Sequence, residues 1–413
     1  MIWLVEALEY RALRYVRQTL APFTILVGPN GSGKSTFLDV TTILADLVSR
    51  HGGVEEAVSL RATDVRQLTF RGTGTRFELA IEAEIPANLR ARLPNDRSTC
   101  CRYEVAIGEM PDGSVGLLAE TLWLKEEVPA SSSTPSLFPL ATPPPSTILA
   151  RPSAGGSKRI VSKVPESGND YFQAETADWK NQFRLGPRKA ALANLPEDEE
   201  KWPVATWFKR TLLEKVQKIA LVSDLMRSPC PPGAPRSFLP DGSNLPWVVE
   251  TLDPALRRRW IEHLRTALPE LVDVHVVDRK EDRKRYLSVE YSGGFAVPSW
   301  LVSDGTLRLM ALTLLAYLPE SDHVFLVEEP ENGIHPGNLE TVFQSLDSAY
   351  SAQILCATHS PVFLSLARAD RILCFAKTDR EGIALVRGSE HPLLRNWKKE
   401  VDLGTLLASG VLG

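Results

Sequence analysis

FTILVGPNGSGKST, residues 23–36, joins an apolar run, a glycine-rich turn and a helix start in one short stretch. The run FTILV is rich in β-branched and aromatic residues, which favours a buried strand. The next residues, GPNGSGKS, have the spacing G-x-x-x-x-G-K-S, and apolar residues then recur at helical spacing at Phe37, Val40, Leu44 and Leu47. A strand, this turn and a helix in direct succession predict a loop that holds phosphate groups.

The residue types in this loop have separate tasks. Glycines let backbone N–H groups close around phosphate oxygens, a lysine adds a positive charge, and a serine hydroxyl can ligate Mg²⁺. We therefore expect Lys34 at the phosphates of a nucleotide and Ser35 on the metal. The alternative, a chance glycine-rich turn, is disfavoured by the strand before it and the helix after it. The expected nucleotide-binding residues are Gly28, Pro29, Asn30, Gly31, Ser32, Gly33, Lys34, Ser35 and Thr36.

A second apolar run ends in two acidic residues. In HVFLVEEPENGIHP, residues 323–336, four apolar residues directly precede Glu328 and Glu329. At the carboxyl end of a buried strand, the first carboxylate can hold the Mg²⁺ shell and the second can polarise an attacking water. A charged turn that closes a strand is the alternative, but the apolar run places the pair at the ligand-binding edge of a parallel sheet. We expect Glu328 to be a metal ligand and both glutamates to be catalytic.

A histidine follows a third apolar run. QILCATHSP, residues 353–361, leads from the apolar positions 354–357 into Thr358, His359 and Ser360. A lone histidine is usually a satisfied polar residue. Because His359 ends a core strand downstream of the acidic pair, we expect it to contact the γ-phosphate of the nucleotide. The expected catalytic residues are Glu329, Glu328, His359 and Lys34.

The stretch VSDGT, residues 302–306, precedes the long apolar run LRLMALTLLAYL. A helix start leaves backbone N–H groups unpaired and carries the positive end of the helix dipole, so it can hold an anion. The other interpretation is an N-cap, because Ser and Asp are common capping residues. Taken alone, the stretch favours the cap.

Together these segments resemble the ATP-binding-cassette ATPases. VSDGT resembles a degenerate form of that family's signature L-S-G-G-Q: Ser303 and Gly305 match it, whereas Asp304 and Thr306 depart from it. The resemblance implies ATP and Mg²⁺ as ligands, and a homodimer that forms head to tail on ATP binding. Ser303 and Gly305 of one copy would then contact the γ-phosphate on the other copy's loop. It also implies that Glu329 is the catalytic base, that Glu328 replaces the usual Mg²⁺-linked aspartate, and that His359 is the switch histidine.

The spacing of the motifs narrows the family. Ser303 lies 303 − 34 = 269 residues after Lys34, which resembles the RecF/SMC-like branch, whose two ATPase lobes are separated by an insertion. The phrases FLPDGSNLPWVV, EEPENGIHP and DLGTLLASGVLG further resemble bacterial AAA-family ATPases of this branch, of the DNA-repair and phage-defence type. EYRAL resembles their NFRSL, which implies that Arg11 contacts a phosphate. Gln67 is a candidate for the Q-loop glutamine, and a solvated surface glutamine is the alternative.

The expected fold is α/β, namely an ABC-type ATPase head with a mixed or parallel core sheet, an antiparallel β subdomain, a helical insertion and no long coiled coil. Residues 1–127 would form the N-terminal ATPase lobe with the phosphate loop and the antiparallel subdomain. Residues 128–270 would form an insertion with proline-rich loops at 129–152 and 228–240, and a helix whose apolar face runs from Phe208 to Ile219. From Leu271, strands and helices alternate again, which predicts a parallel sheet in a C-terminal lobe over residues 271–413.

Composition excludes several classes of protein. The chain of 413 residues has a net charge of −4 and five cysteines without a C-x-x-C pair, so neither a general basic field nor a disulfide or zinc scaffold is expected. We expect a cytoplasmic protein, because no secretory pattern or membrane-length apolar run is present. After His359 only 413 − 359 = 54 residues remain, so no C-terminal nuclease domain is expected. Basic residues gather at Arg257–Arg259, which could grip phosphates, and at residues 278–286, where interleaved acids favour a solvated turn.

The sequence thus predicts an ATPase that acts in DNA repair or anti-phage defence with a separately encoded effector, such as a nuclease or toxin, and with double-stranded DNA as a possible partner. The alternative is a nucleotide-gated scaffold that sequesters an effector protein without binding DNA. A transporter cassette is a third hypothesis, for which a membrane partner would be the distinguishing sign.

Overall fold

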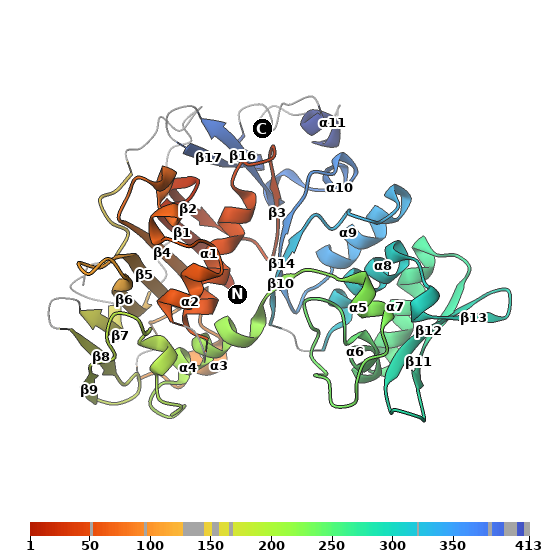
Figure 1. The fold of residues 1–413 in the computed structure, drawn as a ribbon, viewed down its shortest axis with the longest axis horizontal. Coiled ribbons are helices and arrows are strands. Elements are labelled where there is room, and N and C mark those ends of the chain that lie inside the picture. Colours follow the sequence, from red (N-terminus) through yellow and green to blue (C-terminus); the bar gives the residue numbers. More distant parts are fainter. Residues whose placement is uncertain are drawn as a thin grey trace.

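The computed structural model describes residues 1–49, 53–94, 97–126, 144–150, 157–164, 168–319, 322–378, 382–391 and 403–408. A central sheet lies between two lobes (Figure 1). One lobe holds a large antiparallel sheet with the N-terminal helices, and the other holds a small sheet with the helices of the second half of the chain.

The central sheet has six strands in the order β10-β14-β15-β3-β16-β17. All neighbours are parallel except β16 and β17, so the sheet is mixed, as expected. The strands are β3 (Phe23–Val27), β10 (Val216–Ile219), β14 (Val324–Glu328), β15 (Gln353–Ala357), β16 (Ile372–Thr378) and β17 (Gly382–Arg387).

The inner strands β3, β14 and β15 are buried on both faces, which explains why they are mostly apolar runs. Along β14, Val324 and Leu326 belong to one hydrophobic core and Phe325 and Val327 to the other. The first core includes α1 (Lys34–Leu47) and the antiparallel sheet. The second includes residues of α7 (Pro254–Ala267), α8 (Asp304–Leu314), α9 (Leu339–Asp347) and α10 (Pro361–Ser365).

The antiparallel sheet has eight strands in the order β2-β1-β4-β5-β6-β7-β8-β9. It begins in the region expected to form the antiparallel subdomain and continues beyond residue 128, because β7 to β9 extend it. The strands are β1 (Ile2–Tyr10), β2 (Leu13–Thr19), β4 (Arg76–Glu84), β5 (Cys100–Glu109), β6 (Val115–Lys125), β7 (Ser157–Val164), β8 (Asn169–Gln173) and β9 (Lys180–Phe183). The short helices α2 (Val54–Ser59), α3 (Ala87–Arg90) and α4 (Pro203–Arg210) belong to the same lobe (Figure 1).

One face of this sheet carries a buried charged cluster. The Arg102 guanidinium lies 2.9 Å from Glu6, 3.0 Å from Glu82 and 2.7 Å from Glu104, and all four side chains are buried. Residues 144–150 cover the cluster, since the Ile148 carbonyl accepts a hydrogen bond from Arg102 at 2.8 Å. The three carboxylates thus share one guanidinium, and Lys125 adds a second positive charge 2.6 Å from Glu82, so the cluster is stabilised by groups of the protein rather than by water.

The third sheet corrects one prediction. Residues from Leu271 onward do not enter the parallel sheet directly, because β11 (Leu271–Asp278), β12 (Arg285–Tyr291) and β13 (Phe295–Pro298) form a separate antiparallel sheet. Parallel strands resume only at β14. The turn between β11 and β12 contains residues 279–284, four of which are basic and two acidic. Asp282 lies close to both Arg279 and Lys284, as expected of a solvated turn.

The helix predicted through Ile219 is wrong in its second half. α4 ends at Arg210, one π-helical turn follows over Thr211–Lys215, and Val216–Ile219 is strand β10 beside β14. A short apolar spacing fits either element, and the free edge of the parallel sheet favours the strand. Strands β7 to β10 all lie within the expected insertion, residues 128–270. β7 to β9 join the antiparallel sheet and β10 joins the central sheet. The division of the chain into domains at residues 128 and 271 remains a prediction.

The remaining segments complete the lobe with the small sheet. α5 (Ser223–Arg227) and α6 (Leu245–Thr251) flank the proline-rich residues 228–240, which contain no helix or strand, and α11 is Leu403–Ala408. Most of the expected loop at 129–152 lies outside the described residues. Within the described part of the chain the longest helices, α1 and α7, have 14 residues each, so no long coiled coil is present there. The same residues include no helix long and apolar enough to cross a membrane.

Candidate functional site

Three strand ends meet at the carboxyl edge of the central sheet. β15 lies between β3 and β14, and Ala357 is in register with both Leu26 and Glu328. The residues that follow these three strands are therefore neighbours although they are far apart in the sequence. They are the phosphate loop (residues 28–35), the acidic turn (residues 328–334) and the segment that contains His359.

The phosphate loop keeps its backbone open at the start of α1. Gly28 has a φ of 151°, and a Cβ atom there would stand 2.3 Å from the Phe375 carbonyl oxygen, so no other residue fits. The loop ends at Gly33, which precedes the 14-residue helix α1. The free N–H groups and the positive dipole end of this helix point into the loop, which makes it suited to an anion.

Lys34 lies within this loop with its charge turned inward. Its Nζ donates to the carbonyl oxygens of Gly28 at 2.7 Å and Pro29 at 3.0 Å. Burial lowers the pKa of Lys34 to about 8, and the charges of Glu329, Glu328 and Glu331 act in the opposite direction. The ammonium group is still protonated at neutral pH and can turn toward a phosphate.

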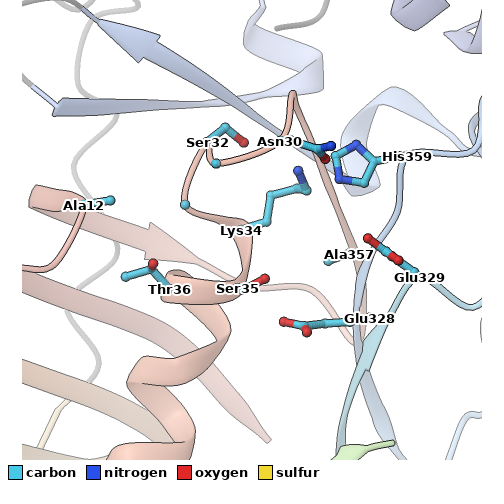
Figure 2. Close-up of a pocket in the computed structure, with 12 residues that line it drawn as sticks. Ala12, Asn30, Ser32, Lys34, Ser35, Thr36, Glu328, Glu329, Ala357 and His359 are labelled. Atoms are coloured by element: carbon cyan, nitrogen blue, oxygen red, sulfur yellow. The ribbon is translucent and has the colours of Figure 1, made fainter. Parts of the chain in front are cut away.

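The phosphate loop and the first residues of α1 form one wall of a cavity of about 380 Å³. Its other wall comes from the ends of β14 and β15, and Ala12 closes one side (Figure 2). Lys34 reaches toward Asn30 and His359, while the Glu328 carboxylate points toward Ser35 (Figure 2). The cavity-lining residues are Ala12, Asn30, Gly31, Ser32, Gly33, Lys34, Ser35, Thr36, Glu328, Glu329, Ala357 and His359.

The donors and acceptors in this cavity fit a nucleotide phosphate and a divalent cation. Ser32 Oγ is buried and has no hydrogen-bond partner among the described residues, so it can still donate to an arriving phosphate oxygen. Glu328 pairs with Lys218 at 3.2 Å through Oε2, whereas its buried Oε1 has no such partner in the same part of the chain. Hydroxyl and carboxylate oxygens are the ligands that Mg²⁺ takes from proteins, and Ser35 and Glu328 supply one of each.

Glu329 has an unusual backbone conformation for its residue type. Its φ is 49°, in the left-handed region, and its N–H donates to the Ala357 carbonyl at 2.7 Å. The side chain is exposed at the cavity and accepts a hydrogen bond from Asn332 Nδ2 at 2.5 Å. Such conformations cost free energy and occur preferentially at functional sites. The conformation of Glu329 thus places its carboxylate at the cavity.

His359 lies opposite the phosphate loop. Burial lowers the pKa of its imidazole, the nearby Lys34 lowers it further, and Glu329 and Glu331 act in the opposite direction. A neutral imidazole can donate one hydrogen bond to a phosphate oxygen and accept another. The backbone N–H of His359 donates to Glu331 Oε1 at 2.9 Å.

Several expected site residues lie outside this cavity. Arg11 forms an ion pair with Asp39 of α1 at 3.2 Å, and its neighbour Ala12 lines the cavity instead. Gln67 is exposed in a short 3₁₀ helix, Val65–Leu68, and does not line the cavity. Gly28 and Pro29 take part through the carbonyls that accept from Lys34.

Ser303 and Gly305 lie at the start of α8, in the lobe of the small sheet. Ser303 is the N-cap, and its Oγ accepts a weak hydrogen bond from Thr306 N–H at 3.3 Å, as the capping interpretation predicts. Both Ser303 and Asp304 are exposed, and Asp304 pairs with Arg227. The helix start does not line its own chain's cavity and faces solvent.

Sequence reasoning missed Glu331, Asn332 and Lys218. Asn332 donates a hydrogen bond to the Glu329 carboxylate, and Glu331 accepts one from the His359 backbone N–H. Their only signal was the polar stretch ENG after the pair. Lys218 gave no signal, because its strand was predicted as a helix.

A family model described as "AAA domain, putative AbiEii toxin, Type IV TA system" matches residues 23–365, which is 343 of the 413 residues. The chain belongs to this AAA family. No curated protein sequence matches the chain. The family match covers the phosphate loop, the acidic turn, the start of α8 and His359, and confirms the expected bacterial AAA-family ATPase.

Solved SMC head domains are similar in fold to this AAA-family chain. The SMC head bound to the C-winged helix domain of ScpA has a TM-score of 0.52 and 16% identity, with 94% of this chain and 98% of that chain covered. A Pyrococcus furiosus SMC head bound to the C-terminal domain of ScpA has 14% identity, coverages of 97% and 99%, and a TM-score of 0.49. The Thermotoga maritima SMC head has 12% identity, coverages of 94% and 98%, and a TM-score of 0.44. The first similarity confirms the predicted ABC-type ATPase head fold of the SMC-like kind.

Proposed function

We propose that this chain binds ATP with Mg²⁺ and hydrolyses it, with Glu329 as the base. The observation that carries the proposal is the convergence of Lys34, Glu329 and His359 on one cavity at the N-terminus of α1. A positive charge for the phosphates, a carboxylate for the water and a hydrogen-bonding imidazole are the groups that phosphoryl transfer to water requires.

Each residue has one task in the proposed reaction. The loop N–H groups and Lys34 hold the β- and γ-phosphates, while Ser35 and Glu328 hold Mg²⁺, which neutralises charge on the phosphate oxygens when it is bound. Glu329 orients the attacking water and accepts its proton. His359 donates a hydrogen bond to a γ-phosphate oxygen. Arg11 and Thr36 remain part of the proposed nucleotide contacts.

We further propose that a second copy completes the site. Ser303 caps the 11-residue helix α8, is exposed, and lies outside its own chain's cavity. The free N–H groups at the start of this helix are therefore available to a phosphate bound to another molecule. Beside it, Trp300 is 44% and Leu301 is 70% exposed. Large apolar side chains at this exposure are typical of a contact surface. In a two-fold pair, Ser303 and Gly305 of each copy would face the nucleotide of the other.

At the level of the cell, we propose a role in DNA repair or anti-phage defence with a separately encoded effector in the cytoplasm. The family description, which names a toxin system, supports the defence setting. Arg258 and Arg259 on α7 are exposed and could reach double-stranded DNA. The SMC head bound to a ScpA domain supports the second candidate, a nucleotide-gated scaffold for a protein partner.

The test is steady-state ATP hydrolysis with and without double-stranded DNA. Glu329→Gln should bind ATP, lose turnover and accumulate as an ATP-bound dimer in size-exclusion chromatography with light scattering. Glu340→Gln, a matched change at an exposed position of α9, should behave like the wild type. Normal hydrolysis by Glu329→Gln would refute the assignment of the base. Turnover that depends on Glu329 but is indifferent to DNA would favour the scaffold.

A further inference from the structure

Glu331 joins the acidic turn to the end of β15. Its Oε1 accepts one hydrogen bond from Thr358 Oγ1 at 2.8 Å and another from the His359 backbone N–H at 2.9 Å. Hydrogen bonds to an ionised acceptor are about twice as strong as those between neutral groups. A single carboxylate oxygen of Glu331 therefore holds both Thr358 and the backbone of His359.

The partners of Glu331 are themselves rigid. Thr358 is fully buried, and its N–H donates to the Leu26 carbonyl of β3 at 3.1 Å. Its Oγ1 also accepts from Ser360 N–H at 3.0 Å, so its hydroxyl hydrogen remains directed at Glu331. Thr358 therefore has a fixed orientation, and the Glu331 carboxylate links Thr358 and the His359 backbone to the acidic turn.

On its other side, Glu331 lies in the turn that carries Glu329. Asn332 N–H donates to the Glu329 carbonyl at 3.0 Å, and Ile334 N–H donates to the Glu331 carbonyl at 3.1 Å. The side chain of Asn332 also donates to the Glu329 carboxylate. Hydrogen bonds of the acidic turn therefore connect Glu329, the proposed base, to His359, and Glu331 lies between these two residues.

We propose that Glu331 is a positioning residue that sets the place of His359 relative to Glu329 across the phosphate site. The proposal rests on the proposed ATPase function. It assigns Glu331 the role of a hydrogen-bond acceptor and not of a base or metal ligand, because Oε1 is already used twice within the protein. Unlike Glu328 and Glu329, Glu331 also does not line the phosphate cavity.

Two substitutions at Glu331 separate positioning from direct chemistry. Glu331→Gln keeps the acceptor oxygen and removes the charge, whereas Glu331→Ala removes both. Glu331→Ala should lower kcat roughly 10- to 100-fold, the range found when an outer-shell partner of a site residue is lost, with KM for ATP within about threefold of the wild type. Glu331→Gln should restore most of kcat. If Gln is as inactive as Ala, or if Ala is fully active, the positioning role is wrong.

Thr358→Val provides a second variant if Glu331→Ala does not fold. It replaces the hydroxyl with a methyl group of similar size and removes one of the two hydrogen bonds to Glu331. We expect a fall in kcat smaller than that of Glu331→Ala. Glu340→Ala, on the exposed face of α9, is the matched control and should leave both kcat and KM unchanged.

A readout independent of turnover distinguishes this proposal from the proposed function. The imidazole C–H resonances of His359, assigned by comparison with His359→Gln, can be recorded by NMR in the nucleotide-free protein. Glu331→Ala should shift them, Glu331→Gln should shift them less, and Glu340→Ala should not. Unshifted resonances in Glu331→Ala would refute the proposal. If the wild type does not hydrolyse ATP, the proposed function fails, and the resonances still decide the role of Glu331.

Discussion

Gly305, at the start of α8, packs so closely on Gly333 of the acidic turn that a Cβ atom at Gly305 would stand 2.7 Å from the Gly333 carbonyl oxygen. The glycine that matches the family signature therefore has a structural task within its own chain. It lets the helix start that carries Ser303 pack against the turn that carries Glu329 and Glu331. The helix start of α8 and the acidic turn, which we propose to act on different nucleotides, are thus joined within the chain by a close backbone contact.

Gly305→Ala should lower the free energy of unfolding by about 1–3 kcal/mol, because an added methyl group meets backbone that cannot rotate away. Urea denaturation followed by circular dichroism measures the change. Gly337→Ala is the control: like Gly305, Gly337 has no positive φ, but its Cβ would meet only the His335 side chain, at 3.2 Å, and no backbone atom within 4 Å. Equal losses in the two variants would show that the contact with Gly333 is not limiting.

Arg102→Met should destabilise the antiparallel sheet strongly. Removing the guanidinium leaves Glu6, Glu82 and Glu104 buried without their shared partner, and breaking a buried ion pair in this way costs about 3–5 kcal/mol. Arg17→Met is the matched control, since Arg17 lies 3.8 Å from Glu6 and is 43% exposed; exposed pairs contribute about 0–1 kcal/mol. Denaturant midpoints of the two variants should therefore differ clearly. A small effect of Arg102→Met would mean that the carboxylates take up protons at little cost.

The affinity for ATP should fall as the pH rises above about 8, the pKa of Lys34. Phosphate favours the charged ammonium, so above this pH the free protein must take up a proton on binding, and affinity falls by up to about tenfold per pH unit. Lys34→Arg stays charged, so its affinity should be flat between pH 7.5 and 9.5. A fluorescent ATP analogue measures both proteins.

The free energy of folding depends on pH at Lys34 in the opposite direction to the affinity for ATP. A lysine whose pKa is lowered in the folded state binds fewer protons there than in the unfolded state. Its contribution therefore makes folding more favourable as the pH rises from about 8 to the ordinary value of 10.5. A wild-type affinity that stays constant to pH 9.5 would contradict the lowered pKa.

The strand ends of the site could be predicted from the sequence, and some of its connections could not. β3, β14 and β15 are mostly apolar runs; β3 leads into the glycine-rich loop, and the other two lead into polar residues. Parallel strands bring such ends to one edge of the sheet. The role of Glu331 depends on Thr358, which is 27 residues away, and no local pattern encodes that contact. Likewise, β10 has helical apolar spacing, and only the free edge of β14 shows that it is a strand.

Double substitution of Arg258 and Arg259 by Glu should abolish any stimulation of ATP hydrolysis by double-stranded DNA. Both side chains are exposed on α7, whereas Arg257 donates to Asp273 and to the Val274 carbonyl at 2.8 Å each. Arg257→Ala should therefore affect stability more than DNA. In a plot of the logarithm of the DNA-binding constant against the logarithm of the salt concentration, each lost phosphate contact should reduce the steepness of the slope by about 0.9. Unchanged stimulation in the double variant would place the DNA contact elsewhere.

Leu301→Glu and Ser303→Arg should each prevent ATP-dependent dimerisation while leaving ATP binding to the single chain intact. Leu301 is 70% exposed beside the Ser303 helix start, so a carboxylate there costs the monomer little but would be buried, unpaired, in a two-fold contact. Arginine at Ser303 would fill the space in front of the helix N–H groups. The measurement is light scattering with ATP in the Glu329→Gln background, where dimers should persist.

Tyr350→Glu is the control for Leu301→Glu, because it introduces the same charge at a side chain that is 88% exposed. Tyr350 lies just before β15, at the amino edge of the central sheet and away from the phosphate loop. Tyr350→Glu should dimerise like its Glu329→Gln parent. Each variant must also bind a fluorescent ATP analogue as the parent does, which separates a lost contact surface from a damaged site. Dimers that form equally well with Glu at 301 and at 350 would exclude the Ser303 face, and the second copy would have to approach the cavity from another side.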